Sequence, residues 1–440
     1  MSAPLTTHSL TGEIVKTFRD HQFSAGKESR EEAIHHFENL GLPGNKSEEY
    51  RFTPITRSLE KNFSAKQFTN AAFSALDNID EFRIPDYESN LIVFINGQYS
   101  QQFSKIISPK EQLSVQSLQS ALDENSEMVV GHFSKLMIAK SDPFAALNTA
   151  FWQDGVFIRV PADTVVESPV VILHIHDAMQ EPVVSVTRLL MMVGENSEAS
   201  LVEKFDSVGK NPVFSSLVEE IFVKEKARLS YCKIQNDQGL LYQVTNTAIH
   251  QGDASRVNTF TLSLSGQLIR NNFGIAVDGE GCESHFYGLY LLDKNTLTDN
   301  HTVVDHCKPN SFSNELYKGI MDGNSKGVFN GKIYVRPHAQ KTNAFQSNRN
   351  ILLSDTAAIN TKPQLEIWAD DVKCSHGCTS GQLDEEALFY LQSRGISKAS
   401  AQALLLYAFA GEIIAPMKNL TLKNYLDQLI SARLNNNLIS

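Results

Sequence analysis

Between Gly155 and Val372 the sequence repeats one kind of segment, a short run rich in Val, Ile, Leu, Phe and Thr. The runs recur about every ten to thirteen residues, and turn-forming residues such as Gly252-Asp253 separate them. No convincing amphipathic helix interrupts these roughly 215 residues, a length that exceeds one ordinary β-sandwich. The chain must therefore build either two β domains or one β-solenoid.

Nine of these runs are clear enough to be predicted as strands. They are Val165–His176, Arg188–Val193, Ala199–Phe205, Leu217–Val223, Arg228–Ile234, Tyr242–His250, Arg256–Leu264, Leu268–Val277 and His285–Leu292. Most of the turns between them lack the Asn-Gly type of dipeptide that closes tight hairpins. Regular spacing without hairpin signals favours a β-solenoid, although no strict repeat signature is present.

The first 150 residues have a different pattern, in which helix signals mix with short strands. Ser29 followed by Glu32 has the form of a capping box, an apolar stripe comes next, and Gly41 ends the predicted helix. A second helix is predicted over Glu111–Leu122. We therefore expect residues 1–150 to form a helical or α/β domain.

The last sixty residues are helical in pattern as well. Asp384, Ser397 and Thr421 each stand at the start of an apolar stripe with helical spacing. A helical tail over residues 381–440 exposes more apolar surface than it can bury within itself, so it should pack on the β body or on a partner. Residues 151–380 remain as the predicted β core.

Charge and cysteine content exclude several classes of protein. A formal net charge of −11 argues against a nucleic-acid or anionic-membrane binder, since both depend on basic patches. No apolar run approaches the roughly 18 residues that cross a bilayer, and residues 1–8 show no secretory signal. Five scattered cysteines do not resemble a disulfide framework. We expect a cytoplasmic protein.

Three metal-ligand residue types alternate near the end of the predicted β region. Cys374, His376 and Cys378 lie on Asp371–Cys378, and an extended backbone aims all three at the same side. Thiolate and imidazole suit iron, zinc or copper, but one extended segment does not complete a tetrahedral site. The motif therefore looks like half of a metal site. The alternative is small packed cysteines beside a satisfied polar histidine.

Several stretches near these residues carry a family resemblance. They are Phe329–Val335, Gln346–Leu353, Thr361–Ile367, Asp370–Gly377 and Phe389–Ile396. Together they resemble the SufB/SufD family of iron-sulfur cluster assembly proteins, and the resemblance is strong from about residue 155 to the end. Residues 40–43 and 48–53 resemble the amino-terminal pattern of the SufD branch, and the cysteine of the matching SufB segment is missing from residues 200–206.

The resemblance implies a mainly β fold, a right-handed parallel β-helix core with flanking helical domains. It also implies a scaffold subunit rather than an enzyme, in a complex with a SufB-like subunit and a SufC-like ATPase. SufB and SufD would pair through their β-helix ends, and residues of about 381 to 434 would bind the ATPase. No G-x-x-x-x-G-K-[ST] motif is present, so we expect this chain to bind no nucleotide. An exposed end strand also allows a homodimer of the isolated chain.

The resemblance places His376 and Cys374 at the interface between SufB and SufD. It implies that an iron-sulfur cluster forms there transiently and is shared with SufB. Cys378 departs from the family, which usually has alanine after the His-Gly pair. This extra thiol is either a third ligand or a small packed side chain, and we favour packing.

Other candidate residues have structural explanations. His174 and His176 alternate in an apolar strand and are predicted to be a buried or solvent-facing pair. A polar cluster near a turn is compatible with a polar network or with a weak metal site, but we favour turn chemistry; its residues are Asp299, His301, Asp305 and His306. The remaining candidates, which we assign to core packing or to amide ladders, are Cys232, Cys282, Cys307, Asn343, Gln346, Asn348 and Asn350.

Two enzyme functions remain as alternatives. The first is a β-solenoid enzyme that acts on polysaccharides, which the missing secretory signal disfavours. The second is a zinc hydrolase built on Cys374 and His376, which lacks an obvious third ligand and a general base.

Overall fold

The computed structural model describes residues 9–23, 26–44, 47–124, 127–137, 141–237 and 239–437. Residues 1–8, which show no secretory signal in the sequence, lie outside the described residues. Among the helices of the described residues, none is long and apolar enough to cross a membrane.

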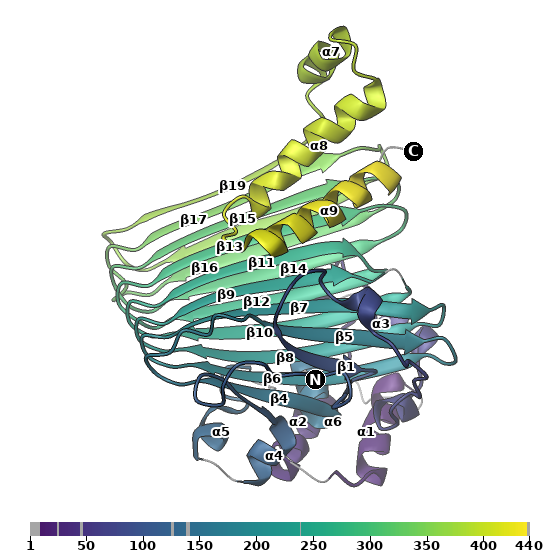
Figure 1. The fold of residues 1–440 in the computed structure, drawn as a ribbon, viewed down its shortest axis with the longest axis vertical. Helices are drawn as coiled ribbons and strands as arrows, with labels where there is room; N and C mark the ends of the chain where they lie inside the picture. The colour runs from purple at the N-terminus through teal and green to yellow at the C-terminus, as the bar shows by residue number, and fades with distance from the viewer. Residues whose placement is uncertain are drawn as a thin grey trace.

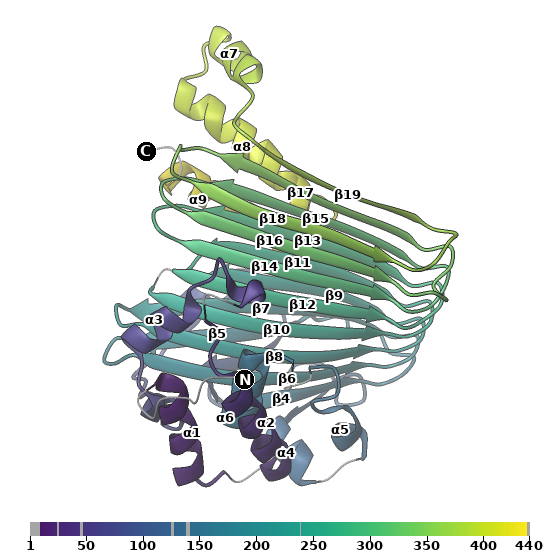
Figure 2. The same cartoon turned by 180° about the vertical axis from the view of Figure 1, so that it is seen from behind.

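Two facing β-sheets make up most of the molecule (Figures 1 and 2). Sheet A has the strand order β19-β17-β15-β13-β11-β9-β7-β5-β1-β2, and sheet B has the order β18-β16-β14-β12-β10-β8-β6-β4-β3. The strands are β1 Asn90–Ile95, β2 Gln98–Tyr99, β3 Ser114–Ser117, β4 Asp154–Val160, β5 Val170–Ala178, β6 Val183–Val193, β7 Glu198–Gly209, β8 Val213–Val223, β9 Arg228–Asn236, β10 Leu241–Gln251, β11 Arg256–Ser265, β12 Leu268–Val277, β13 Glu283–Leu292, β14 Leu297–His306, β15 Phe312–Met321, β16 Lys326–Val335, β17 Asn343–Leu352, β18 Ala358–Ile367 and β19 Lys373–Gly381.

From β4 onward, successive strands alternate between the two sheets, and neighbours within each sheet are parallel. Each coil of the chain therefore gives one strand to each sheet, which is the architecture of a β-solenoid. The prediction of a mainly β solenoid fold is confirmed, and each of the nine predicted runs overlaps a strand from β5 to β13.

The turn signals of the sequence mark the corners of the coils. Asn196, Lys226 and Ala254 occupy one corner on successive coils, each in the left-handed conformation with φ of 54°, 55° and 51°. Their backbone N–H groups extend the stack, since Asn196 donates to the carbonyl of Glu225 and Lys226 to that of Asp253. The corner thus continues the hydrogen-bond ladder of the sheets, which explains why hairpin dipeptides are not needed.

The helices gather at the two ends and on the outer faces of the sheets. They are α1 Leu10–Asp20, α2 Lys27–Leu40, α3 Ile55–Asn62, α4 Leu118–Asp123, α5 Glu127–His132, α6 Pro143–Phe151, α7 Glu385–Ser393, α8 Lys398–Ile414 and α9 Leu420–Asn437, with short 3-10 helices at Glu48–Tyr50, Ala65–Phe68 and Asp80–Phe82. The amino-terminal helices α1, α2 and α6 share an apolar core with outward-facing residues of sheet B such as Phe214 and Val244. Both views show α1, α2, α4, α5 and α6 around the end that lies opposite β18 and β19.

Two local predictions for this amino-terminal region are wrong. Helix α2 begins at Lys27 after a left-handed Gly26, and Ser29 lies inside the helix, where its hydroxyl donates to the carbonyl of Gly26 at 2.9 Å. The capping box is therefore not formed. In Glu111–Leu122 only the last residues are helical, because Ser114–Ser117 pairs with β4 as an antiparallel strand.

The carboxy-terminal helices α8 and α9 cover the outer face of sheet A, as the apolar tail predicted. Leu406, Ile413 and Leu426 are fully buried in a cluster that includes outward-facing residues of that sheet. Ion pairs also fix the helices, and Arg433 of α9 contacts the carboxylate of Asp293 at 2.6 and 3.0 Å. Helix α7, in contrast, projects beyond the end of the solenoid (Figure 1).

Inside the solenoid, two glycines make room for two tyrosines. A Cβ atom on Gly288 would lie 2.2 Å from the ring of Tyr317, and one on Gly319 would lie 2.2 Å from the ring of Tyr290. Both tyrosines are fully buried. At these two positions the interior therefore has no room for a methyl group.

Gly288→Ala should lower the free energy of unfolding by about 1–3 kcal/mol, because the new methyl group overlaps a ring that has no room to move. The measurement is urea denaturation monitored by circular dichroism. Gly411→Ala on α8 is the matched control, since its Cβ meets nothing within 4 Å and alanine favours a helix. Equal stability of the two variants would contradict the packing argument.

Candidate functional site

The solenoid ends in a coil that has no neighbour on one side. Strands β18 and β19 are the last members of sheets B and A, and each pairs in its sheet with one strand only, β16 and β17 respectively. Their outer edges therefore present backbone donors and acceptors that no strand of the described chain satisfies. Pro363 lies within β18, and proline, which has no N–H to give to a ladder, is typical of an edge strand.

The predicted ligand residues lie on this edge strand. In register with β17, Cys374 stands beside Ala344, His376 beside Gln346 and Cys378 beside Asn348. Ala344, Gln346 and Asn348 are buried in the solenoid interior. The three predicted residues therefore occupy the interior face of the last strand, at the open end of the stack, on one side as the alternation predicted.

The three side chains differ in exposure. Cys374 is half-buried and packs against the interior apolar cluster, and burial raises the pKa of its thiol. His376 and Cys378 are exposed. The Sγ atom of Cys378 lies 2.9 Å from the hydroxyl of Thr361 on β18, so this thiol bridges the two sheets at the open end. Cys378 therefore contacts Thr361 and Asn348 from an exposed position, and its assignment to packing rather than to a third ligand stays a prediction.

No group of three or more His, Cys, Asp or Glu side chains suited to a metal ion occurs among the described residues. Cys374, His376 and Cys378 are spread along an extended strand and do not converge on one point. The three side chains therefore do not form a complete coordination sphere by themselves, and the half-site stays a prediction.

Polar residues continue from this end into the solenoid interior. Gln346 donates to the carboxylate of Glu315 at 2.7 Å, one coil further in. Asn348 donates to the hydroxyl of Tyr290 at 3.1 Å, and Asn350 donates to Asn348 at 2.8 Å. The predicted amide ladders between coils are therefore wrong for these residues, because Gln346 and Asn348 bond to a carboxylate and a tyrosine of earlier coils, and the Asn350–Asn348 pair lies within β17.

The amino-terminal segment reaches the last coils from outside. Glu48 forms an ion pair with Lys362 of β18, and Glu49 forms one with Lys332 of β16 at 3.1 Å. Glu49 also lies 3.2 Å from the imidazole of His301, whose other nitrogen is 3.0 Å from Asp299. His301 therefore joins Asp299 of its own strand β14 to Glu49 of the amino-terminal segment, which is a polar network, and the preferred assignment of this cluster to turn chemistry is wrong. Sequence reasoning missed Glu49 because its partners are hundreds of residues away.

The two histidines of strand β5 are buried. His174 is stacked between Phe94 and Phe205, and its Nε2 lies 3.1 Å from the carboxylate of Glu203. Burial, together with the nearby His176, lowers the pKa of His174 to about 3. A neutral, buried imidazole of this kind contributes to the packing of the solenoid interior. Of the two predictions for this pair, buried or solvent-facing, the buried one is confirmed.

Helix α7 exposes aromatic side chains beyond the terminal coil. Phe389 is 72% exposed and Tyr390 is 57% exposed, and Leu404 of the neighbouring α8 is 50% exposed. These three residues, together called the α7 patch, contrast with the buried apolar residues that dock α8 and α9 on sheet A. A projecting helix with exposed aromatic rings is suited to contact another protein.

Comparisons with known proteins agree with this architecture. The family pattern described as SUF system FeS cluster assembly, SufBD core domain matches residues 174–409, and the SufBD protein N-terminal region matches residues 8–172. An iron-sulfur cluster assembly SufBD family protein of Synechocystis sp. is 31% identical over 98% of this chain and 100% of its own length. SufD of Escherichia coli is 28% identical over 94% and 95%, and SufB of Bacillus subtilis is 26% identical over 86% and 83%.

Glu315→Gln should flatten the dependence of stability on pH. Burial raises the pKa of Glu315 from 4.5 to about 7, so the native state binds this proton more tightly than the unfolded chain does. The resulting stability is fully present below pH 4.5 and is lost as the pH rises past about 7. The measurement is urea denaturation at pH 5, 6, 7 and 8.

The matched control is Glu366→Gln, which changes an exposed carboxylate on β18. This control should keep the decline in stability between pH 5 and pH 8 that the unmodified protein shows. If the stability of Glu315→Gln falls between pH 5 and pH 8 as steeply as that of the control, the proton responsible for this pH dependence is not on Glu315.

Proposed function

Because the chain belongs to the SufBD family of iron-sulfur cluster assembly proteins, we propose that it is a SufD-like scaffold subunit of the SUF system. In this role it pairs with a SufB-like subunit, recruits a SufC-like ATPase and helps to hold a nascent cluster without catalysing a reaction of its own. Family membership leaves the polysaccharide-active and zinc-hydrolase alternatives without support. The observation that carries the proposal is the position of His376, exposed on the open edge of the solenoid beside Cys374.

Pairing with a SufB-like subunit is supported by the unpaired edges of β18 and β19. A β-strand edge with free backbone groups is a template for another strand. A SufB-like chain with the same solenoid architecture would present an equivalent edge, and the two ends would then form continuous sheets. In the absence of that subunit a second copy of this chain is the natural occupant, which is how a homodimer would arise.

The residues at this edge have the chemistry to contact the cluster as cargo. A neutral imidazole nitrogen of His376 and a thiolate of Cys374 are both ligands for iron. Two donors on one strand leave the remaining positions to sulfide and to the partner subunit. The cluster would therefore be shared across the interface and would leave when the two subunits separate or move.

Recruitment of the ATPase is assigned to the carboxy-terminal helices. Helices α8 and α9 are fixed on sheet A by buried apolar residues, whereas the α7 patch faces solvent. A partner that hydrolyses ATP could then act on the solenoid through a helix that is already anchored at its other end. This supports the α7 patch, rather than the whole tail, as the contact.

His376→Ala should lower the iron and sulfide content of the complex purified after co-expression with SufB-like and SufC-like partners. The imidazole is exposed and packs against little, so the melting temperature and partner retention should stay nearly unchanged. Cys374→Ala should lower cluster content less, and Cys378→Ala should have little effect. The measurements are anaerobic absorption spectra with iron and sulfide analysis.

Ser375→Ala is the control, because Ser375 is exposed on the opposite face of the same strand. Normal cluster content in His376→Ala, or unfolding of this variant with unchanged content per folded complex, would refute the role of His376. Failure of the unmodified chain to co-purify with either partner would refute the scaffold function itself.

The double variant Phe389→Asp with Tyr390→Asp should lose the ATPase in the same co-purification while it keeps the SufB-like subunit. Charged side chains on the α7 patch disfavour an apolar contact, and the patch lies outside the core that holds α8 and α9. Phe73→Asp is the matched control, since Phe73 is 61% exposed in the amino-terminal region. Unchanged retention of the ATPase would contradict the assignment.

A further inference from the structure

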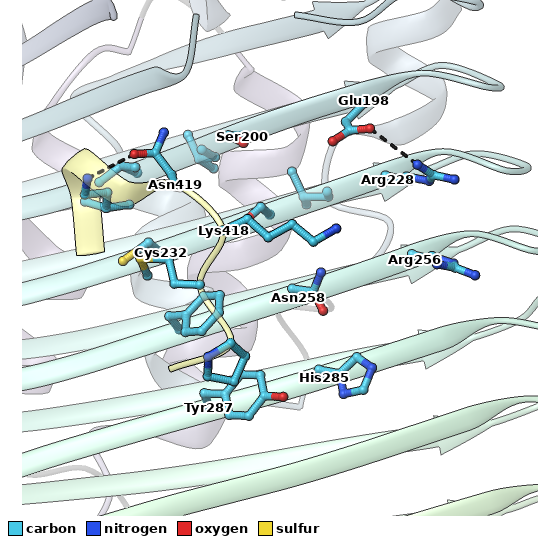
Figure 3. A pocket seen from close by; sticks show the side chains of 18 of the residues that line it. Glu198, Ser200, Arg228, Cys232, Arg256, Asn258, His285, Tyr287, Lys418 and Asn419 are labelled. Atoms are coloured by element: carbon cyan, nitrogen blue, oxygen red, sulfur yellow. Dashed lines mark hydrogen bonds and ion pairs between the residues drawn. The ribbon is translucent and has the colours of Figure 1, made fainter. Parts of the chain in front are cut away.

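A cavity of about 440 Å³ lies on the outer face of sheet A, under the turn that joins α8 to α9 (Figure 3). Strands β7, β9, β11 and β13 form its floor, and Pro416, Met417, Lys418 and Asn419 form its roof. This volume falls within the range of small-molecule sites. The cavity is separate from the open end that carries His376.

The parallel register sorts the floor into rows of one chemical character each. Cys232, Phe260 and Tyr287 stand in register and form an apolar row. The rings of Phe260 and Tyr287 stack with their centroids 5.1 Å apart. Cys232 and Phe260 are buried in one apolar cluster with Met417, whereas Tyr287 is half-buried, so Tyr287 offers the apolar surface of this row to a bound molecule.

A polar row lies two residues nearer the start of each strand. It contains Ser230, Asn258 and His285, again in register. His285 lies 3.0 Å from Glu283 through its Nε2 atom. Its Nδ1 atom is shielded from water and has no hydrogen-bond partner among the described residues. This nitrogen is enclosed by the protein, so the half-buried side chains of Ser230 and Asn258 are the groups of this row that a bound molecule can reach.

A charged row closes the floor and consists of two arginine–glutamate pairs. Arg228 pairs with Glu198 at 3.7 Å, and Arg256 pairs with Glu283 at 3.2 Å. These four residues balance one another. Lys418 adds a third cation from the roof, and Figure 3 shows its side chain extended over the floor toward the polar row.

Lys418 has no carboxylate of its own. No hydrogen bond or salt bridge joins it to another residue in the part of the chain that the structure describes, although its charge reaches Glu283, whose pKa is lowered by His285, Arg256 and Lys418. Helix α9 begins beside it, where Asn419 accepts a hydrogen bond from the N–H of Leu422 at 3.0 Å. The start of an 18-residue helix adds further positive partial charge.

We propose that this cavity binds a small organic anion, whose carboxylate or phosphate group contacts Lys418 and whose flat apolar body lies against Tyr287. Arg228 and Arg256 are each paired with a glutamate, so Lys418 carries the net positive charge of the site, and the polar row supplies hydrogen-bonding groups between the two ends of the ligand. The graded floor, from apolar through polar to charged, fits a molecule with one charged end. This site is independent of the assembly role proposed above.

Ligand-observed NMR titration of the full chain tests the proposal with three probes of one shape: phenyl phosphate, benzoate and the neutral benzyl alcohol. At least one of the two anions should bind more tightly than benzyl alcohol. Lys418→Gln should weaken anion binding about tenfold, as expected for the loss of a charge-assisted contact. Ser230→Phe, which fills the floor, should abolish binding of every probe.

Lys326→Gln is the control, since Lys326 is an exposed cation on strand β16 of sheet B. It should bind the probes as the unmodified chain does, and circular dichroism checks that each variant is folded. Preference for phenyl phosphate or for benzoate identifies the head group. Binding of benzyl alcohol as tight as that of both anions, equal binding by Lys418→Gln and the control, or no binding of any probe at millimolar concentration would overturn the proposal.

Discussion

The structure depends on one constraint, the in-register parallel stacking of coils. Every strand from β5 to β17 satisfies its backbone groups with the coils before and after it, so each residue stands directly beside its counterpart in the next coil. This stacking aligns side chains into rows that run along the sheets. The interior tyrosines and amides, the graded floor of the cavity and the position of His376 beside Gln346 all follow from the same register.

The sequence predicted the architecture better than the details. Strand patterns over Val165–Leu292 were sufficient because buried parallel strands are rich in β-branched and aromatic residues. The repeat has no signature in the sequence, because the corner residues Asn196, Lys226 and Ala254 share a backbone conformation but not a residue type. What repeats from coil to coil is the left-handed backbone angle φ at each corner. This angle is set by the coils that stack on the corner.

For the candidate site, alternation along one strand was enough to place Cys374, His376 and Cys378 on one face. Their different exposure was not predictable, because it depends on the coil beneath them and on where the stack ends. The network of Glu49 and His301 and the cavity beneath Lys418 combine residues far apart in the chain. Local patterns carry no information on such pairs, and long-range packing alone brings them together.

The ion pair between Glu48 and Lys362 joins residues separated by 314 positions in the chain. During synthesis the amino-terminal segment leaves the ribosome long before strand β18 exists, so this contact forms only after nearly every coil has stacked. Until then Glu48 has only solvent to face, whereas the partners of the adjacent Glu49, His301 and Lys332, belong to earlier coils. Formation of the Glu48–Lys362 ion pair would therefore indicate that the last coil of the scaffold has folded. It is a late step in folding, and the large sequence separation of the two residues makes it slow.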